Sequence, residues 1–387
     1  MVEQKTNSQR RRRTIDRRVR EARLLLRGAV STDHPIMAHI IPIRRCNLSC
    51  AYCNEYDNFS KPVSLSTMLH RIELLGNLKT GVITLSGGEP LLHPELDEII
   101  SGIRRHATLA GLITNGYLLT AERVNRLNDA GLDYLQISID NVLPDEVSKK
   151  SLKVLDRKLE WLAEYAEFDI TINSVLGSEV KQADDAYQIA KRSRELGFES
   201  TVGILHDGNG QLKPLSSEQM GVYERIFGLR SGLFSFTHHD RFQQNIVRAV
   251  PNTWHCPAGG RFLYICEDGL VHYCSQQRGF PAIPLEKYTR EDLIREGMKP
   301  KGCAPFCTIS CVHQTAMLES FRTQPKETLA GIINRRKERD PSWNVPASIR
   351  TLEWMFLRDS KTRNLFGALA MKAFGIKRSS ANMQRSE

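Results

Sequence analysis

Three cysteines lie within one stretch of eight residues, Cys46-Asn-Leu-Ser-Cys50-Ala-Tyr-Cys53. Thiolates three and four residues apart on a short loop can converge on a single inorganic cluster. A [4Fe-4S] cluster that only carries electrons takes four cysteines, so a set of three leaves one iron open to a ligand that is not protein. An open metal position indicates chemistry, as it does at catalytic zinc sites. A closed zinc knuckle and an accidental grouping are the alternatives.

A second motif follows, in which a short apolar strand runs into a glycine turn that ends in an acid: Val82-Ile-Thr-Leu-Ser86-Gly87-Gly88-Glu89-Pro90. With this turn, and with Tyr52 directly before the last cysteine of the loop, the chain resembles the radical S-adenosylmethionine (radical SAM) enzymes over residues 36–210. The glycines allow close backbone approach to a ligand, and Glu89 suits a cationic amine. An accidental match of both motifs is far less common than one of the cysteine spacing alone.

The resemblance implies cofactors and site residues. Cys46, Cys50 and Cys53 would bind a [4Fe-4S] cluster whose fourth iron holds S-adenosylmethionine (SAM). The remaining candidates would contact SAM: Gly87, Gly88 and Glu89 its amino group, Tyr52 its adenine through backbone, Ser138 and Asp140 its ribose or carboxylate, and Asn115 and Ser174 neighbouring polar atoms. For the last four, an ordinary turn-forming role at a strand end is the alternative.

The reaction that the resemblance implies begins with one electron from a low-potential donor such as flavodoxin or ferredoxin. Reductive cleavage of SAM then gives a 5′-deoxyadenosyl radical that abstracts hydrogen from a substrate. In such enzymes the cofactors perform the difficult steps, while the protein binds, orients and excludes water.

The order of apolar runs predicts an α/β fold. Short apolar strands alternate with helical stretches, which is typical of βα units and a parallel sheet. We expect strands near 39–43, 82–86, 109–114, 134–139, 169–175 and 199–204, with helices near 64–76, 94–106, 120–130, 153–166, 183–196 and 216–229. Six repeats match the partial (β/α)6 TIM-type barrel implied by the resemblance, within a domain at 35–240. The motifs fall at strand carboxyl ends, where parallel barrels place reactive groups.

A cysteine-rich extension is expected at 250–320. Cys256, a predicted β-hairpin around Gly269, and Cys274 form a C-x12-G-x4-C pattern that resembles the SPASM or twitch extension of radical SAM enzymes. Cys303, Cys307 and Cys311 follow, and the full SPASM cysteine run is absent, so we expect one auxiliary Fe-S cluster. Its ligands would be Cys256, Cys274 and at least two of the last three cysteines, with Cys307 and Cys311 preferred. A zinc site at Cys303, Cys307, Cys311 and His313 is the alternative, and Cys266 is expected to be a core residue.

The positive charge is concentrated at the two ends of the chain. The net charge is +10, of which residues 1–30 carry +7 and residues 361–387 carry +5, so the body is close to neutral. This distribution disfavours nucleic acid as a partner and favours an anionic surface. No secretory signal or run of 18 apolar residues is present, and nine cysteines at ligand spacings suit a reducing compartment, so we expect a cytoplasmic protein.

Both ends are predicted to contain amphipathic helices. In residues 1–34, Ile15, Val19, Ala22 and Leu26 recur at helical spacing between arginines. This helix either docks on the barrel through its apolar stripe, with its arginines in water, or lies on a membrane surface; a mitochondrial transit peptide fits less well. The tail at 325–387 is basic and helical, with apolar stripes at Leu352, Met355 and Phe356 and at Leu365, Phe366, Leu369, Ala370, Ala373 and Phe374.

These observations favour a radical SAM enzyme that modifies a peptide or small molecule. The alternatives are modification of a membrane-held molecule such as a lipid, modification of RNA, and a non-catalytic Fe-S sensor or electron carrier. The Gly87-Gly88-Glu89 turn argues against the carrier, because an electron carrier needs no binding site for the methionine part of SAM.

Overall fold

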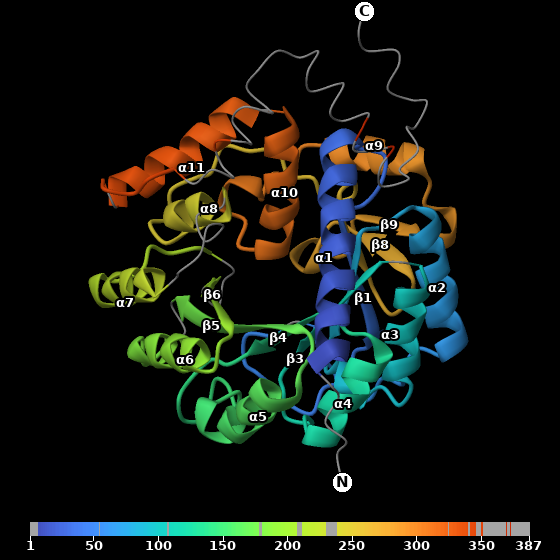
Figure 1. Cartoon of the computed structure of the whole chain (residues 1–387), viewed down its shortest axis with the longest axis horizontal. Coiled ribbons are helices and arrows are strands. Elements are labelled where there is room, and N and C mark those ends of the chain that lie inside the picture. The colour runs from blue at the N-terminus through green and yellow to red at the C-terminus, as the bar shows by residue number, and fades with distance from the viewer. Residues whose placement is uncertain are drawn as a thin grey trace, which may run out of the picture.

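The computed structural model has one nine-stranded sheet with helices packed against it (Figure 1). It describes residues 7–53, 55–106, 108–177, 180–206, 211–229, 238–323, 325–339 and 341–345, with 350, 369 and 372. The strand order is β6-β5-β4-β3-β2-β1-β7-β8-β9, parallel from β6 to β7 and antiparallel thereafter. The strands are β1 (Met37–Ile43), β2 (Val82–Gly87), β3 (Leu109–Thr114), β4 (Tyr134–Ser138), β5 (Asp169–Gly177), β6 (Glu199–Leu205), β7 (Phe262–Ile265), β8 (Leu270–His272) and β9 (Pro281–Pro284).

The predicted alternation of strands and helices is confirmed. The helices of the barrel are α2 (Leu65–Asn77), α3 (Leu96–Arg105), α4 (Ala121–Ala130), α5 (Leu152–Tyr165), α6 (Asp184–Glu195) and α7 (Ser217–Gly228). Local sequence explains their ends: the Ser64 and Thr120 side chains accept backbone N–H groups of the first turns of α2 and α4. Gly131 ends α4 in the left-handed conformation, which glycine adopts without strain.

The two faces of the barrel strands differ in polarity. Ile40, Leu85, Leu112, Ile137 and Ile172 are almost fully buried against the helices. The residues that alternate with them point to the inner face, because successive side chains on a strand point to opposite sides. On this inner face the half-buried side chains include the uncharged hydrogen-bonding groups of Gln136, Ser138, Thr171, Asn173 and Thr201, together with the apolar Ile113.

The cysteine-rich segment continues the barrel sheet. β7 pairs in parallel with β1, with Tyr264 opposite His39, and β8 and β9 extend the sheet from there. The hairpin prediction is confirmed, but pairing of its first strand with β1 was not predicted, because a short apolar run does not identify its neighbour. Beyond β6, the structure adds α8 (His238–Ile246), α9 (Arg290–Met298), α10 (Ser310–Thr323) and α11 (Pro325–Arg339).

Helix α1 (Asn7–Val30) lies across the strand starts and docks through its arginines. Arg20 donates to both carboxylate oxygens of Asp133, just before β4, at 2.8 and 2.7 Å, and Arg17 pairs with Asp169, the first residue of β5. Both arginines are buried.

The prediction that α1 docks through its apolar stripe with its arginines in water is therefore wrong for the first half of the helix, whereas Leu24 in the second half does pack against Gly81. Ile15 and Val19 are 55% and 45% exposed. Asp133 at the start of β4 selects the charged face of the helix, because a buried carboxylate is costly unless it is paired, and the exposed Asp169 adds a second partner. This preference cannot be read from the helix itself.

No helix among the described residues is both long and apolar enough to cross a membrane. The apolar stripes predicted for the C-terminal tail, apart from Leu369, lie outside the described residues.

Candidate active site and cysteine centres

The cysteine loop and the glycine turn are joined through their backbones. Gly88 N donates to Ile43 O at 3.1 Å, and Glu89 N donates to Arg45 O at 2.9 Å, directly before Cys46. A Cβ atom at Gly88 would collide with the carbonyl oxygens of Arg44 and Arg45. Gly87 has φ +115°, which favours glycine. The glycines are thus required by close packing of the two motifs against each other.

Glu89 lies buried between the ends of β2 and β3. It is completely buried, and its carboxylate accepts from Leu91 N at 2.9 Å, Thr114 Oγ1 at 2.7 Å and Asn115 N at 2.8 Å. Burial raises the pKa of Glu89, while these hydrogen bonds act to lower it. Its side chain therefore joins the ends of β2 and β3, and the part of the Gly87-Gly88-Glu89 turn in holding the SAM amino group stays a prediction.

The three sulfurs of the cysteine loop face one another closely enough to interact electrostatically. Leu48 N donates to Cys46 Sγ at 3.4 Å, and the N–H of Glu55 donates to Cys53. Four-coordinate zinc with bonds of 2.3 Å would bring its sulfurs to about 3.8 Å from one another. Among the described residues, no three cysteine ligand atoms lie within 4.8 Å of one another. The spacing therefore suits a multi-iron cluster better than a single zinc ion.

Tyr52, Asp140 and Lys150 form a buried polar group beside this loop. Tyr52 Oη donates to Asp140 Oδ2, and Lys150 Nζ donates to Tyr52 Oη and lies 3.1 Å from Asp140 Oδ2. Burial acts to lower the pKa of Lys150, but Asp140, Tyr52 and Cys50 together outweigh it and the pKa is raised. Asp140 Oδ1 is buried with no hydrogen-bond partner among the described residues. This oxygen is therefore a ready acceptor for a ligand hydroxyl.

The other candidates lie at different distances from the cysteine loop. Asn115 Nδ2 donates to Asn47 Oδ1 at 2.8 Å and lies 3.7 Å from Cys46 Sγ. Ser138 ends β4 on the inner face, opposite Asn173. Ser174 is fully buried, donates to Thr201 O, and shares its strand face with Ile172, which packs against the helices. The structure thus brings Asn115 to the cluster loop and places Ser174 on the helix side.

A model of the radical SAM superfamily matches residues 40–209, the segment that holds both motifs and all six barrel strands but the start of β1. Residues 40–209 are a radical SAM domain. The predicted family is therefore confirmed.

Curated relatives match parts of the chain. A PqqA peptide cyclase of Rhizobium meliloti is 32% identical over 190 residues, covering 44% of this chain and 48% of the relative. A PqqA peptide cyclase of Gluconobacter oxydans is 36% identical over 101 residues, covering 25% and 28%. A GTP 3′,8-cyclase of Microcystis aeruginosa is 39% identical over 116 residues, covering 28% and 35%. The chain thus spans less than half the length of each of these relatives.

The fold is similar to that of a crystal structure of Streptococcus suis SuiB, with a TM-score of 0.52 and 14% sequence identity. The likeness covers 67% of this chain and 66% of that one. At this identity it supports the fold alone.

Outside the radical SAM domain, four further thiols gather between the hairpin and the segment before α10. Cys307 lies close enough to Cys256, Cys274 and Cys303 for electrostatic interaction with each of them. Burial raises the pKa of Cys274 to about 12. Cys256, Cys274 and Cys307 each accept the N–H of the residue two positions later, the same pattern as at Cys46 and Cys53.

Cys311 and Cys266 have other electrostatic neighbours than these four thiols. No other cysteine is among the groups that act on the pKa of Cys311, but Cys311 packs against the apolar cluster that contains Cys256 and Cys274, so its predicted role as a ligand stays a prediction. Cys266 is fully buried in the apolar cluster around β7. It also lies within 4.8 Å of ligand atoms of Asp268 and His272, but Gly279 N already donates to His272 Nδ1 and Arg278 donates to Cys266.

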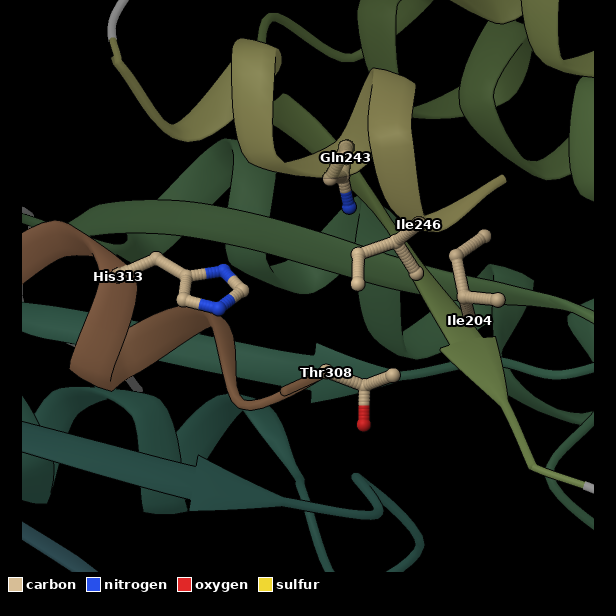
Figure 2. Close-up of a pocket in the computed structure, with 5 residues that line it drawn as sticks. All are labelled: Ile204, Gln243, Ile246, Thr308 and His313. Carbon is tan, nitrogen blue, oxygen red and sulfur yellow. The ribbon is translucent and has the colours of Figure 1, made fainter. Parts of the chain in front are cut away.

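His313, a ligand in the zinc alternative, lies among aromatic rings. Its ring stacks on that of Phe242, with the ring centroids 4.4 Å apart, and meets the ring of Trp254 edge-on, with the centroids 5.1 Å apart. Figure 2 shows it at one side of a small pocket that it shares with Ile204, Gln243, Ile246 and Thr308. None of these neighbours is a cysteine, which leaves the zinc alternative without support.

Sequence reasoning missed two residues at the site. Lys150 sits in a loop of mixed polar residues, and nothing local marks it as buried. Tyr264 on β7 donates to the half-buried Glu55, two residues after Cys53, so it links the cysteine loop to the extension. From the sequence, Tyr264 is one residue of a short apolar strand, two positions after Phe262, and this pattern predicts only that its side chain is in the core.

We expect Gly88→Ala to displace the cysteine loop. The added methyl group meets two backbone carbonyls that have no room to move without breaking the bond from Glu89 N. Iron bound per chain after anaerobic reconstitution should fall at least several-fold. Gly221→Ala on α7, where a methyl group meets nothing, is the matched control and should bind iron normally. Normal iron binding by both variants would contradict this role for Gly88.

Proposed function

We propose that this protein is a radical SAM enzyme that uses a [4Fe-4S] cluster at Cys46, Cys50 and Cys53. When bound, the cluster and SAM supply one-electron reductive chemistry that ends in hydrogen abstraction by a 5′-deoxyadenosyl radical. The observation that carries the proposal is the convergence of three thiols, spaced too widely for zinc, beside the unpartnered Asp140 Oδ1.

The protein's own groups bind and orient. Asp140 Oδ1 accepts from a ligand hydroxyl, while Tyr52 and Lys150 occupy Oδ2 and fix the carboxylate. Ser86 Oγ, buried at the end of β2 without a partner among the described residues, offers a second hydrogen-bonding atom. The close backbone contact between Gly88 and Arg44 holds the cysteine loop in a fixed position relative to Asp140 and Ser86. A low-potential donor such as flavodoxin or ferredoxin would provide the electron.

Reduced protein should cleave SAM to 5′-deoxyadenosine and methionine, measured by chromatography after anaerobic reconstitution and addition of dithionite. Cys50→Ala should reduce the product to background, because two thiols hold an open cluster poorly. Cys311→Ala, outside both thiol groups, should retain cleavage. Iron-loaded wild-type protein without cleavage would favour a non-catalytic sensor or carrier and refute the enzyme.

We also propose one auxiliary Fe-S cluster, held by Cys256, Cys274, Cys303 and Cys307. Support comes from the gathering of the four thiols and from the N–H donors to three of their sulfurs, since hydrogen bonds to sulfur are a means by which proteins tune such clusters. Four cysteines complete a [4Fe-4S] cluster, so this site would transfer electrons.

The ligand set can be tested by comparing two cysteines eight positions apart. Cys303→Ala should lose about one cluster's worth of iron, on the order of half of the total for two [4Fe-4S] clusters. Cys311→Ala should keep the wild-type content, determined by iron and sulfide analysis with Mössbauer spectra. The reverse result would restore the pairing of Cys307 with Cys311.

We propose a peptide or small molecule as the substrate. The inner face of the barrel carries uncharged amide and hydroxyl groups, which suit neutral amide-like or hydroxylated groups better than phosphates. Relatives with partial coverage include PqqA peptide cyclases.

We further propose that the outward face of α1 contacts an anionic membrane. Ile15 and Val19 are exposed beside Arg18, whose side chain is 64% exposed, as on interfacial helices. In flotation assays, vesicles containing phosphatidylglycerol should bind the protein and pure phosphatidylcholine should not. Ile15→Glu with Val19→Glu should abolish binding, whereas Val154→Glu on α5 should not; equal binding by both would contradict this contact.

A further inference from the structure

We propose that Ser148 and Lys150, in the loop between β4 and α5, are positioning residues that raise the reduction potential of the cluster at Cys46, Cys50 and Cys53. The inference rests on the proposed function and deepens it. It names a second loop, outside both sequence motifs, that acts on this centre.

The loop is in direct contact with the cysteine loop. Ala51 N donates to Val147 O at 2.9 Å. Ser148 Oγ lies 3.6 Å from Cys50 Sγ, and both residues are buried. Lys150 Nζ lies 5.0 Å from the centre of the Tyr52 ring, and Tyr52 itself stands between Cys50 and Cys53 in the sequence. The loop between β4 and α5 therefore contacts the middle of the cysteine loop.

The hydrogen-bond pattern fixes the direction of the Ser148 contact. Ser148 Oγ already accepts from Lys150 N at 3.2 Å. Its own proton is therefore available, and a thiolate sulfur that binds iron can only accept. Ser148 Oγ thus donates to Cys50 Sγ, as the backbone N–H groups of Leu48 and Glu55 donate to Cys46 and Cys53.

Both residues favour the reduced cluster. Reduction adds one negative charge, which a hydrogen bond to sulfur stabilises. Lys150 contributes a buried positive charge, with its side chain only 12% exposed. Asp140 neutralises part of this charge, so we expect the larger effect from Ser148, whose donor no other group opposes.

The contacts are not needed to fold the loop. Asp145 Oδ1 accepts from Val147 N and Ser148 N at 2.9 and 2.8 Å. Asn141 Nδ2 donates to Ser148 O, and Val142 N donates to Asp185 Oδ2. These bonds hold the backbone whether or not the Ser148 hydroxyl is present, so its removal should leave the loop in place.

The test is an EPR-monitored redox titration of reconstituted protein, following the signal that changes on addition of SAM. Ser148→Ala should titrate at a more negative potential than wild type with unchanged iron content. Ser151→Ala is the matched control, because Ser151 is also buried in this segment but its Oγ has no partner among the described residues. It should titrate with wild type.

Lys150→Gln keeps a hydrogen-bonding side chain without the charge and should also shift the potential downward. If this variant binds no cluster, because Asp140 is left without its cation, the Ser148→Ala result decides the inference. Either variant titrating together with Ser151→Ala overturns the role of its residue. A wild-type protein without a SAM-sensitive signal would instead contradict the proposed function, so the two failures are distinguishable.

Discussion

The site depends on backbone contact between two segments that are about forty residues apart in the sequence. Gly88 packs against the carbonyls of Arg44 and Arg45, and Glu89 N donates to Arg45 O. The Glu89 side chain then extends the same structure to Thr114 and Asn115 at the end of β3. The ends of three neighbouring strands are therefore one hydrogen-bonded unit, and the thiols begin at its edge.

The position of this unit follows from the separation of polarity in the barrel. Helices bury the outward residues of every barrel strand, so helix packing determines which way each strand faces. The inner face combines small and polar residues with the apolar cluster around Ile41 and Tyr264; on it Gly111 lies opposite Thr84 and Gly203 opposite Val175. The outer face thus provides the main core of the barrel, and the polar positions of the inner face remain available for binding.

Most of the fold could be predicted because the periodicity of hydrophobic residues and the glycines that end helices are local properties of the sequence. The strand and helix ranges, and both motifs at strand ends, follow from such signals. The docking face of α1 could not be predicted, because it depends on Asp133 and Asp169, more than a hundred residues away. The same holds for the burial of Lys150 and for the proximity of Cys303 to Cys307, since spacing shows which thiols can meet but not how the loop before α10 turns. The hydrogen bonds of the Glu89 side chain to Leu91, Thr114 and Asn115 could not be predicted either, because they depend on how the ends of β2 and β3 meet.

The pairing of β7 with β1 has a consequence for electron movement. β1 leads directly into Cys46, and β7 leads through its hairpin to Cys274. Both groups of thiols therefore follow strands that are paired with each other in the same sheet. In a protein whose second centre sat on a hinged module, substrate closure could lengthen or shorten the tunnelling path. Here any electron exchanged between the centres would cross a gap that the sheet holds constant, and its rate would respond to driving force rather than to domain motion.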